Sequence, residues 1–138
     1  MAERKELQEK ILTYRILENR LEDLLKQREM VISKLIEIQN TLGSMDEIEK
    51  SKEEILFPIG AEAYTFGKVI DKNRIMVDVG ANVILEKTLK EGKQILEKRK
   101  IEIENGLGEM QKEVAEMSAA LEQLGPEIQN MNEEAEAG

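Results

Sequence analysis

Apolar residues recur at alternating steps of three and four along the first part of the chain, in a background of Glu, Lys and Gln. One line of positions is Leu7, Tyr14, Leu21, Arg28, Leu35 and Leu42, and the other is Lys10, Leu17, Leu24, Val31, Ile38 and Met45. Ile11, Leu25 and Ile32 widen this stripe. A heptad pattern of this length is typical of a coiled-coil helix. We predict helical structure over 1–53, interrupted at Gly43-Ser44, where Ser44 and Glu47 have the spacing to cap a further helical stretch.

The last part of the chain carries an equally regular heptad. Its lines are Leu89, Leu96, Ile103, Met110, Met117, Leu124 and Met131, and Lys93, Lys100, Leu107, Val114, Leu121 and Ile128. Thr88 and Glu91 have capping-box spacing, so we predict a second helix over 87–131. Gly125-Pro126 is expected to disrupt this helix, because proline lacks a backbone donor and clashes with the preceding turn. The acidic tail at 132–138 is expected to be frayed.

The central segment 54–86 differs from both flanks, because it is rich in β-branched and aromatic residues that alternate with polar ones. We predict strands at Ile55–Ile59, Tyr64–Ile70, Arg74–Val79 and Val83–Glu86. A tight loop at Asp71-Lys72-Asn73, with Asn73 in the left-handed conformation, should join the middle two strands. Gly80-Ala81-Asn82 should join the last two. The segment therefore forms two linked β-hairpins between two long helices.

These elements predict an α+β fold in a single domain over 1–138, in which an antiparallel two-helix coiled coil carries the two central hairpins. A few charged residues occupy positions in the apolar lines. If the two helices fold back from the hairpins as an antiparallel pair, each of these residues comes close to an opposite charge on the other helix. In this register Lys10 faces Glu127, Arg28 faces Glu109 and Lys100 faces Glu37.

The composition narrows the class of function. The formal net charge is −9 in 138 residues, which disfavours nucleic acid and anionic lipid as ligands. The chain has no Cys and no His, so disulfides, thiol nucleophiles and the commonest general base are excluded. No apolar run approaches the length of a membrane span, and the first residues are too charged for a signal peptide. We expect a cytoplasmic protein that does not bind a membrane.

A search for catalytic or metal-binding motifs yields two superficial matches. The segment from Gly60 to Lys68 resembles a phosphate-binding loop, but the spacing of its glycines is wrong and Val69 replaces the Ser or Thr. Asp71-Lys72-Asn73 begins like a calcium loop, but the acid-and-glycine pattern does not continue. We therefore predict no enzyme activity, no catalytic residues, no metal site and no cofactor.

The end of the helix pair where the two termini meet is the more informative region. Apolar residues gather there, and Pro126 is expected to end regular pairing nearby. We predict an exposed apolar cluster whose Met residues adapt to irregular partners. Its members are Leu7, Ile11, Leu12, Tyr14, Met117, Leu121, Leu124, Ile128 and Met131. For any one of these residues, an ordinary coiled-coil core position is the competing interpretation.

Nearly the whole chain resembles the α-class subunit of prefoldin, of the archaeal type. The resemblance is carried by Leu56-Phe57-Pro58-Ile59-Gly60, by Val77-Asp78-Val79-Gly80 and by Glu86-Lys87 at the entry to the second helix. Four strands, rather than a single hairpin, point to the α class. Asn82 departs from the pattern, because many relatives have Gly there.

This resemblance implies an ATP-independent chaperone: a hexamer of two α-class and four β-class subunits whose hairpins form an oligomeric β-barrel platform. The helix tips would capture unfolded proteins and deliver them to a group II chaperonin. Independently, isolated hairpins are marginal in water and need partner strands. We expect the oligomerisation residues to be Ile55, Phe57, Ile59, Tyr64, Phe66, Ile75, Val77 and Val79.

A second hypothesis is a structural coiled-coil homo-oligomer or filament scaffold that does not deliver clients. It uses the same hairpins but needs no binding surface at the tips. Two measurements distinguish the hypotheses. One is suppression of client aggregation, and the other is the size of the protein alone and with a β-class subunit.

Overall fold

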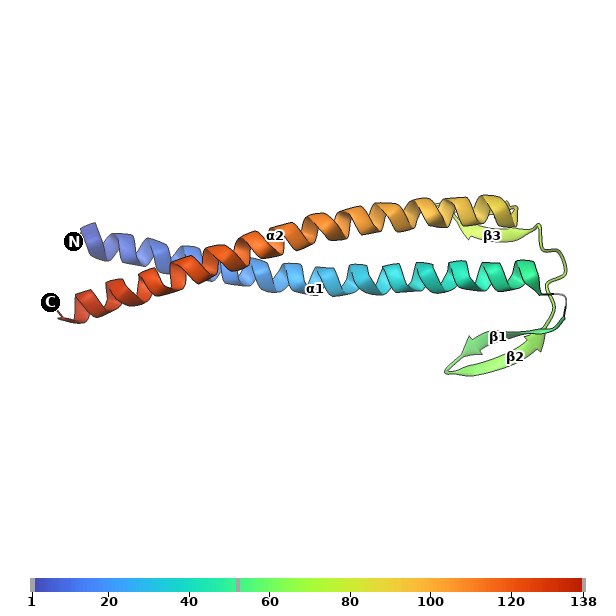
Figure 1. Cartoon of the computed structure of the whole chain (residues 1–138), viewed down its shortest axis with the longest axis horizontal. Helices are drawn as coiled ribbons and strands as arrows, with labels where there is room; N and C mark the ends of the chain where they lie inside the picture. The colour runs from blue at the N-terminus through green and yellow to red at the C-terminus, as the bar shows by residue number, and fades with distance from the viewer. Residues whose placement is uncertain (1, 52, 138) are drawn as a thin grey trace. The chain divides into compact units, whose positions relative to one another are not determined.

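The computed structural model describes residues 2–51 and 53–137, so predictions that concern residues 1, 52 and 138 lie outside the described residues. Two helices flank four short strands (Figure 1). The elements are α1 (Ala2–Lys50), β1 (Ile55–Gly60), β2 (Ala63–Gly67), β3 (Ile75–Asp78), β4 (Ile84–Lys87) and α2 (Leu89–Ala137). The predicted α+β fold of two long helices with two hairpins between them is confirmed.

The chain divides into two compact units. We call Met1–Ser33 with Glu104–Gly138 the terminal unit, and Lys34–Ile103 the hairpin unit. In each unit, a part of α1 lies antiparallel to a part of α2, and the hairpin unit also holds all four strands (Figure 1).

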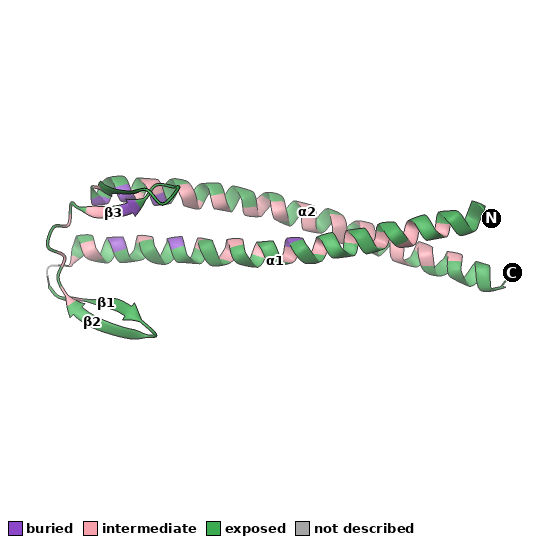
Figure 2. Ribbon diagram, turned by 180° about the vertical axis from the view of Figure 1, so that it is seen from behind, coloured by how far each residue is buried: buried purple, intermediate pink, exposed green. Residues whose placement is uncertain are grey.

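The buried side chains fall on the predicted heptad lines. Every residue assigned to the two lines of each helix is buried or half-buried, and the positions between them are mostly exposed (Figure 2). In the hairpin unit, Ile38 and Met45 of α1 form one apolar cluster with Leu89 and Leu96 of α2. In the terminal unit, Leu24 is buried. The heptad interpretation is confirmed in both units.

The predicted interruption at Gly43-Ser44 is wrong, because α1 runs through both residues to Lys50. Ser44 starts no new helix: its hydroxyl donates to the carbonyl oxygen of Asn40 at 3.1 Å, one turn back in the same helix. Leu42 and Met45 on either side pack into the apolar cluster. Their burial outweighs the roughly 1 kcal/mol that a glycine costs in a helix interior.

The predicted disruption at Pro126 is also wrong, because α2 continues through Pro126 to Ala137 and includes the described part of the acidic tail. Gly125 relieves part of the clash, since proline Cδ meets the N–H and the Cβ of the preceding residue and glycine has no Cβ. Half-buried Leu124, Ile128 and Met131 hold the heptad on both sides of the proline.

The register of the helix pair agrees with the prediction in the terminal unit, where Lys10 Nζ lies 3.2 Å from a carboxylate oxygen of Glu127. The other two predicted charge pairs do not form. Among the described residues, Arg28 makes no ion pair and its buried Nε has no hydrogen-bond partner, while Glu37 pairs with Lys34 instead of Lys100.

The strands pair as β1 with β2 and β3 with β4, in two separate antiparallel sheets. The predicted tight hairpin loop at Asp71-Lys72-Asn73 is therefore wrong, since it lies in the connection between the sheets. It does form a turn: Asn73 N donates to Asp71 Oδ1 at 2.9 Å, and Arg74 N donates to the Asp71 carbonyl oxygen at 3.3 Å. Strand β2 ends at Gly67 rather than Ile70, and β4 spans Ile84–Lys87 rather than Val83–Glu86.

The two hairpin turns share one backbone conformation. Ala61 and Glu62 have φ of 48° and 63°, and Ala81 and Asn82 have φ of 51° and 62°. Positive φ at both central residues defines the type I′ turn, whose twist suits a hairpin. Asn82 is well suited to its position, because Asn tolerates the left-handed conformation better than other non-glycine residues.

Candidate functional site

One face of the second hairpin is covered by its own chain. Ile75 packs against the apolar cluster of the hairpin unit, and Val77 on the same face of β3 is only 7% exposed (Figure 2). Arg99 of α2 donates a hydrogen bond to the carbonyl oxygen of Asp78 and holds the end of the strand. Ile75 and Val77 were expected to contact other subunits, but within this chain they already dock β3 onto the helices.

Gly92 permits this docking. A Cβ added at Gly92 would overlap Ile75 Cδ1 and lie 3.2 Å from Ile75 Cγ1 and 3.6 Å from Met45 Cε. The strand therefore approaches α2 at a point where the helix has no side chain.

Gly92→Ala is expected to destabilise the hairpin unit, because Ile75 must leave its site in a packed cluster to make room. The cost should be on the order of 1–3 kcal/mol. The same change at Gly106 meets no atom within 4 Å and should stabilise α2 by up to about 1 kcal/mol. Urea unfolding of the two variants should give midpoint shifts of opposite sign. Equal shifts would contradict the role assigned to Gly92.

The outer face of the second hairpin is exposed. Met76 of β3 and Ile84 of β4 point away from the covered face, whereas Leu85, which pairs with Val77, lies on the side of the covered face and is only partly shielded there. Val79, which was expected at the interface, is also exposed.

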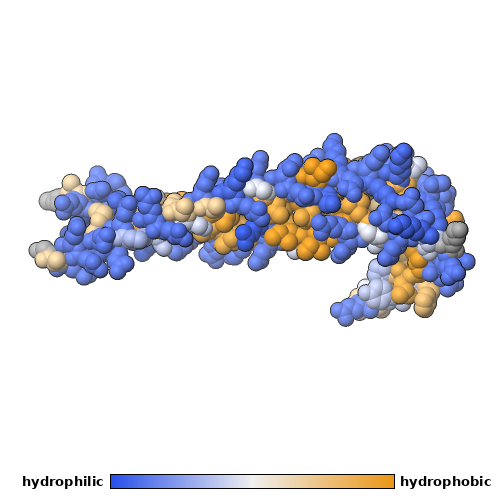
Figure 3. All heavy atoms as spheres, in the orientation of Figure 1, coloured by the Kyte–Doolittle hydropathy of each residue, from blue (hydrophilic) through white to orange (hydrophobic). Residues whose placement is uncertain are grey.

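The first hairpin has a more apolar exposed face. Leu56 pairs with Phe66 and Pro58 pairs with Tyr64, so these four residues share one face, and all are exposed. Figure 3 shows apolar atoms gathered on this hairpin. Ile59 is exposed at its turn, whereas Ile55 and Phe57 on the other face are half-buried, with the Phe57 ring beside Gly67. Exposed apolar residues that share one face make this hairpin a candidate interaction surface.

Sequence reasoning missed part of this surface. Exposed apolar residues that were not assigned to the interface are Leu56, Met76, Ile84 and Leu85 of the hairpins and Ile70 of the connection between them. Alternation along β1 is the sequence signal that separates Leu56 from Ile55 and Phe57, and the strand register then places Leu56 opposite Phe66.

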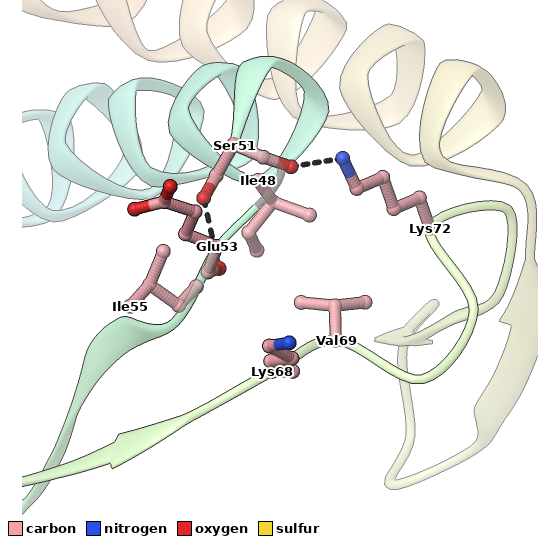
Figure 4. A pocket seen from close by; sticks show the side chains of 7 residues that line it. All are labelled: Ile48, Ser51, Glu53, Ile55, Lys68, Val69 and Lys72. Atoms are coloured by element: carbon pink, nitrogen blue, oxygen red, sulfur yellow. Dashed lines mark hydrogen bonds between the residues drawn. The ribbon is translucent and has the colours of Figure 1, made fainter.

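A small pocket of about 50 Å³ lies where α1 leads into the first hairpin, lined by Ile48, Ser51, Glu53, Ile55, Lys68, Val69 and Lys72 (Figure 4). Lys72 Nζ donates to the carbonyl oxygen of Ser51, just beyond the end of α1. A cation at this position complements the negative end of a helix dipole. The pocket is too small for an organic ligand, so these residues attach the hairpin connection to the helix end.

Ion pairs join the two helices of the hairpin unit beside the docked strand. Lys93 of α2 contacts both Asp46 and Glu49 of α1, with 2.9 Å between Lys93 Nζ and Asp46 Oδ1. Lys93 donates hydrogen bonds to Glu49 and Asp46, which raise the pKa of Lys93, and the hydrogen bond to Asp46 lowers the pKa of that carboxyl group. Across the second hairpin, a bond to Glu86 raises the pKa of Arg74.

The lowered pKa of Asp46 predicts a dependence of stability on acid pH. Its contribution is present above the ordinary carboxyl pKa and is lost as the pH falls through the lowered, folded-state pKa. Lys93→Gln should therefore reduce the melting temperature at neutral pH and have less effect at low pH. Lys26→Gln, which removes an exposed pair with Glu22 within α1, serves as the control. An equal effect of Lys93→Gln at both pH values would contradict the prediction.

At the tip, the end of the terminal unit where both termini lie, the predicted apolar cluster is less exposed than expected. Leu12 is exposed, but Leu7, Ile11, Tyr14, Met117, Leu121, Leu124, Ile128 and Met131 are all half-buried. The expectation depended on the end of pairing at Pro126, and α2 does not end there. In the view of Figure 3 the surface of this end is mainly hydrophilic.

Within residues 2–51 and 53–137, no group of three or more acidic residues is placed to hold a metal ion. Neither described helix is long and apolar enough to cross a membrane.

Two long helices with two β-hairpins between them define an α+β coiled-coil subunit, and comparison with known proteins gives its family. A family model described as "Prefoldin subunit" matches residues 14–134, so the chain belongs to the prefoldin family. Among curated relatives, it is 30% identical to prefoldin subunit alpha of Pyrococcus horikoshii over 132 residues, covering 94% of this chain and 89% of that protein. It is 25% identical to prefoldin subunit alpha of Archaeoglobus fulgidus over 141 residues, covering 99% and 96%.

A solved structure shares this fold. It is the cryo-EM structure of filamentous prefoldin from Methanocaldococcus jannaschii, with a TM-score of 0.67 and 20% identity over 87% of this chain and 98% of that one. The resemblance to α-class prefoldin subunits inferred from the central segment is confirmed.

Proposed function

We propose that this chain is the α-class subunit of a cytoplasmic prefoldin that captures unfolded proteins without ATP and delivers them to a group II chaperonin. In this proposal two copies assemble with four β-class subunits through a β-barrel platform. The exposed apolar face of the first hairpin, with Leu56, Tyr64 and Phe66, carries the assembly part of the proposal. Burial of apolar surface at about 25 cal/mol per Å² would stabilise such a platform.

The apolar residues of the tip support the client-binding part of the proposal. Its apolar residues are half-buried, so some of their surface remains in contact with solvent. Apolar burial is non-directional and therefore suits a surface that binds many different unfolded sequences. Several tips that bind one client together would turn weak contacts into useful avidity.

Deletion of Met1–Leu12 together with Leu121–Gly138 tests this proposal. The truncated chain keeps all four strands and is expected to assemble with a β-class subunit but to lose suppression of client aggregation. Aggregation of a denatured client is followed by light scattering, and assembly by size-exclusion chromatography.

A matched control removes one heptad from the interior of each helix, at Leu21–Gln27 and Met110–Glu116. This deletion shortens the helix pair, keeps its heptad register and retains the tips, so it should preserve protection. Equal protection by the tip-truncated chain would contradict client capture at the tips. Assembly of the full chain alone into long polymers, without protection of clients, would instead favour the scaffold hypothesis.

A further inference from the structure

A hollow of about 400 Å³, which we call the hairpin hollow, lies between the two hairpins of the hairpin unit. Phe57 of β1 lines it, as do Met76 of β3 and Glu86 of β4, which pair with each other across the second sheet. The connection between the sheets completes the lining. Phe57 is half-buried and Met76 is exposed, so the hollow offers an apolar surface that is open to solvent.

An apolar side chain lies at the rim of this hollow. Ile70 belongs to the connection, outside both sheets, and it lines the hollow while being 102% exposed. No part of the described chain covers it, so its burial against another molecule would disturb no packing within the chain. One small surface therefore carries both an apolar recess and an apolar side chain that protrudes beside it.

The charges on the same surface have both signs. Arg74 and Glu86 line the hollow and bind each other at 2.7 Å across the second hairpin. Lys68 and Asp71, which flank Val69-Ile70 in the chain, also line it and are exposed, and neither forms an ion pair within residues 2–51 and 53–137. The Asp71 carboxylate accepts a hydrogen bond from the backbone N–H of Asn73, which is a neutral donor. An unpaired cation and an unpaired anion thus lie close to Ile70.

We propose that this surface contacts the same surface of a second copy of the chain about a two-fold axis. The inference rests on the proposed function, which places two copies in one assembly, and it names the surface through which they meet. Around a two-fold axis one surface faces itself, so each protrusion needs a recess and each charge an opposite charge within that same surface. Ile70 of each copy enters the hairpin hollow of the other, and Lys68 of each copy pairs with Asp71 of the other. Contact with a β-class subunit or with an unfolded client would not require this self-complementarity.

The contact is too small to hold two chains together alone. Stable interfaces bury about 1,200–2,000 Å² in total, and one isoleucine and two exposed ion pairs per two-fold contact cover much less. The exposed faces of the hairpins must therefore supply most of the assembly. The contact at Ile70 determines which chains pair within that assembly, and this role can be measured by competition between chains.

Native mass spectrometry of the assembled complex tests the pairing. Two full-length chains that differ in tag mass are combined in equal amounts with a β-class subunit, one carrying Lys68→Glu and the other Asp71→Lys. A mixed pair regains both ion pairs, whereas a pair of either variant with itself brings like charges together. We expect mixed pairs to exceed their statistical share by about threefold to tenfold, with an excess that shrinks in high salt.

Matched controls separate this contact from general charge effects. Lys112→Glu in one chain and Glu116→Lys in the other reverse the same charges at exposed positions of α2 and should give the statistical share. Ile70→Ser tests the protruding side chain. Complexes with two copies of this variant should dissociate at a higher protein concentration than those of Ile101→Ser, which removes an exposed isoleucine from α2. The isolated Ile70→Ser chain should keep its melting temperature.

The outcomes distinguish this inference from the proposed function. A statistical share of mixed pairs for the Lys68→Glu and Asp71→Lys chains, in complexes that still protect clients, would overturn the inference alone. Client-protecting complexes that contain one copy of the unmodified chain would do the same. Failure of the unmodified chain to assemble with a β-class subunit, or to protect clients once assembled, would overturn the proposed function.

Discussion

Replacement of both Tyr64 and Phe66 by serine is expected to abolish assembly and leave the fold of the chain intact. These side chains are 59% and 73% exposed in the isolated chain, so it has little packing to lose. In an assembly each ring would be removed from water. Burial of an aromatic side chain covers about 150–250 Å², so each ring would contribute on the order of a few kcal/mol to every interface. Multi-angle light scattering should then give the monomer mass, with a helical circular dichroism spectrum like that of the unmodified chain.

The control for this prediction replaces two residues that lie outside the hairpins and are about as exposed as Tyr64 and Phe66. Ile16 and Met30 of α1 are 57% and 74% exposed, close to the values for Tyr64 and Phe66. Ile16→Ser with Met30→Ser should therefore leave assembly unchanged. Assembly of the Tyr64/Phe66 variant at normal size would show that this face of the first hairpin is not an interface.

The long-range pairing of the strands could not be predicted in the same way as the helices. Burial along a helix follows from its 3.6-residue period, so the apolar lines of α1 and α2 could be read directly from the sequence. Turn-forming residues such as Asp71 and Asn73 indicate where the chain bends, but not which strands pair. Ala61 and Glu62 are not typical turn residues, and the first hairpin turn was missed for that reason.

The errors within the helices have a common cause. Gly43 and Pro126 lower helix propensity locally, and propensity alone predicted an interruption at each. The heptad continues through both positions, with Met45 buried after the first and Ile128 half-buried after the second. Packing of the apolar stripe stabilises each helix by more than the glycine or the proline destabilises it locally. This balance depends on the whole stripe, so it could not be judged from Gly43 or Pro126 alone.

The exposure of the hairpin residues was predicted in part. Alternation along β3 separates two faces, but it cannot show which face the chain itself covers. That outcome depends on Gly92, which admits Ile75 close to α2, and Val77 on the same face of β3 is buried as well. Because this contact joins residues far apart in sequence, only the structure reveals Met76 and Ile84 as the outward pair.

Val77→Asp is expected to detach the second hairpin from the helices of the hairpin unit. Val77 is 7% exposed, so a carboxylate at this position would be removed from water, and the guanidinium of Arg99 is already held by the Asp78 carbonyl oxygen. Burial of an unpaired charge or polar group costs several kcal/mol, which exceeds what a two-stranded sheet contributes alone. Hydrogen exchange should therefore show loss of protection in β3 and β4, while the amides of α1 and α2 in the terminal unit keep theirs.

The matched control for Val77→Asp is Met76→Asp on the adjacent residue of the same strand. Met76 is 64% exposed, so its replacement places the same charge in water and should preserve hydrogen-exchange protection. The two variants should also differ in their response to pH. Burial raises the pKa of a carboxyl group, so the damage from Asp at position 77 is greatest above that raised pKa and lessens as the pH falls. Equal protection of β3 in both variants at neutral pH would contradict the docking of this hairpin through Val77.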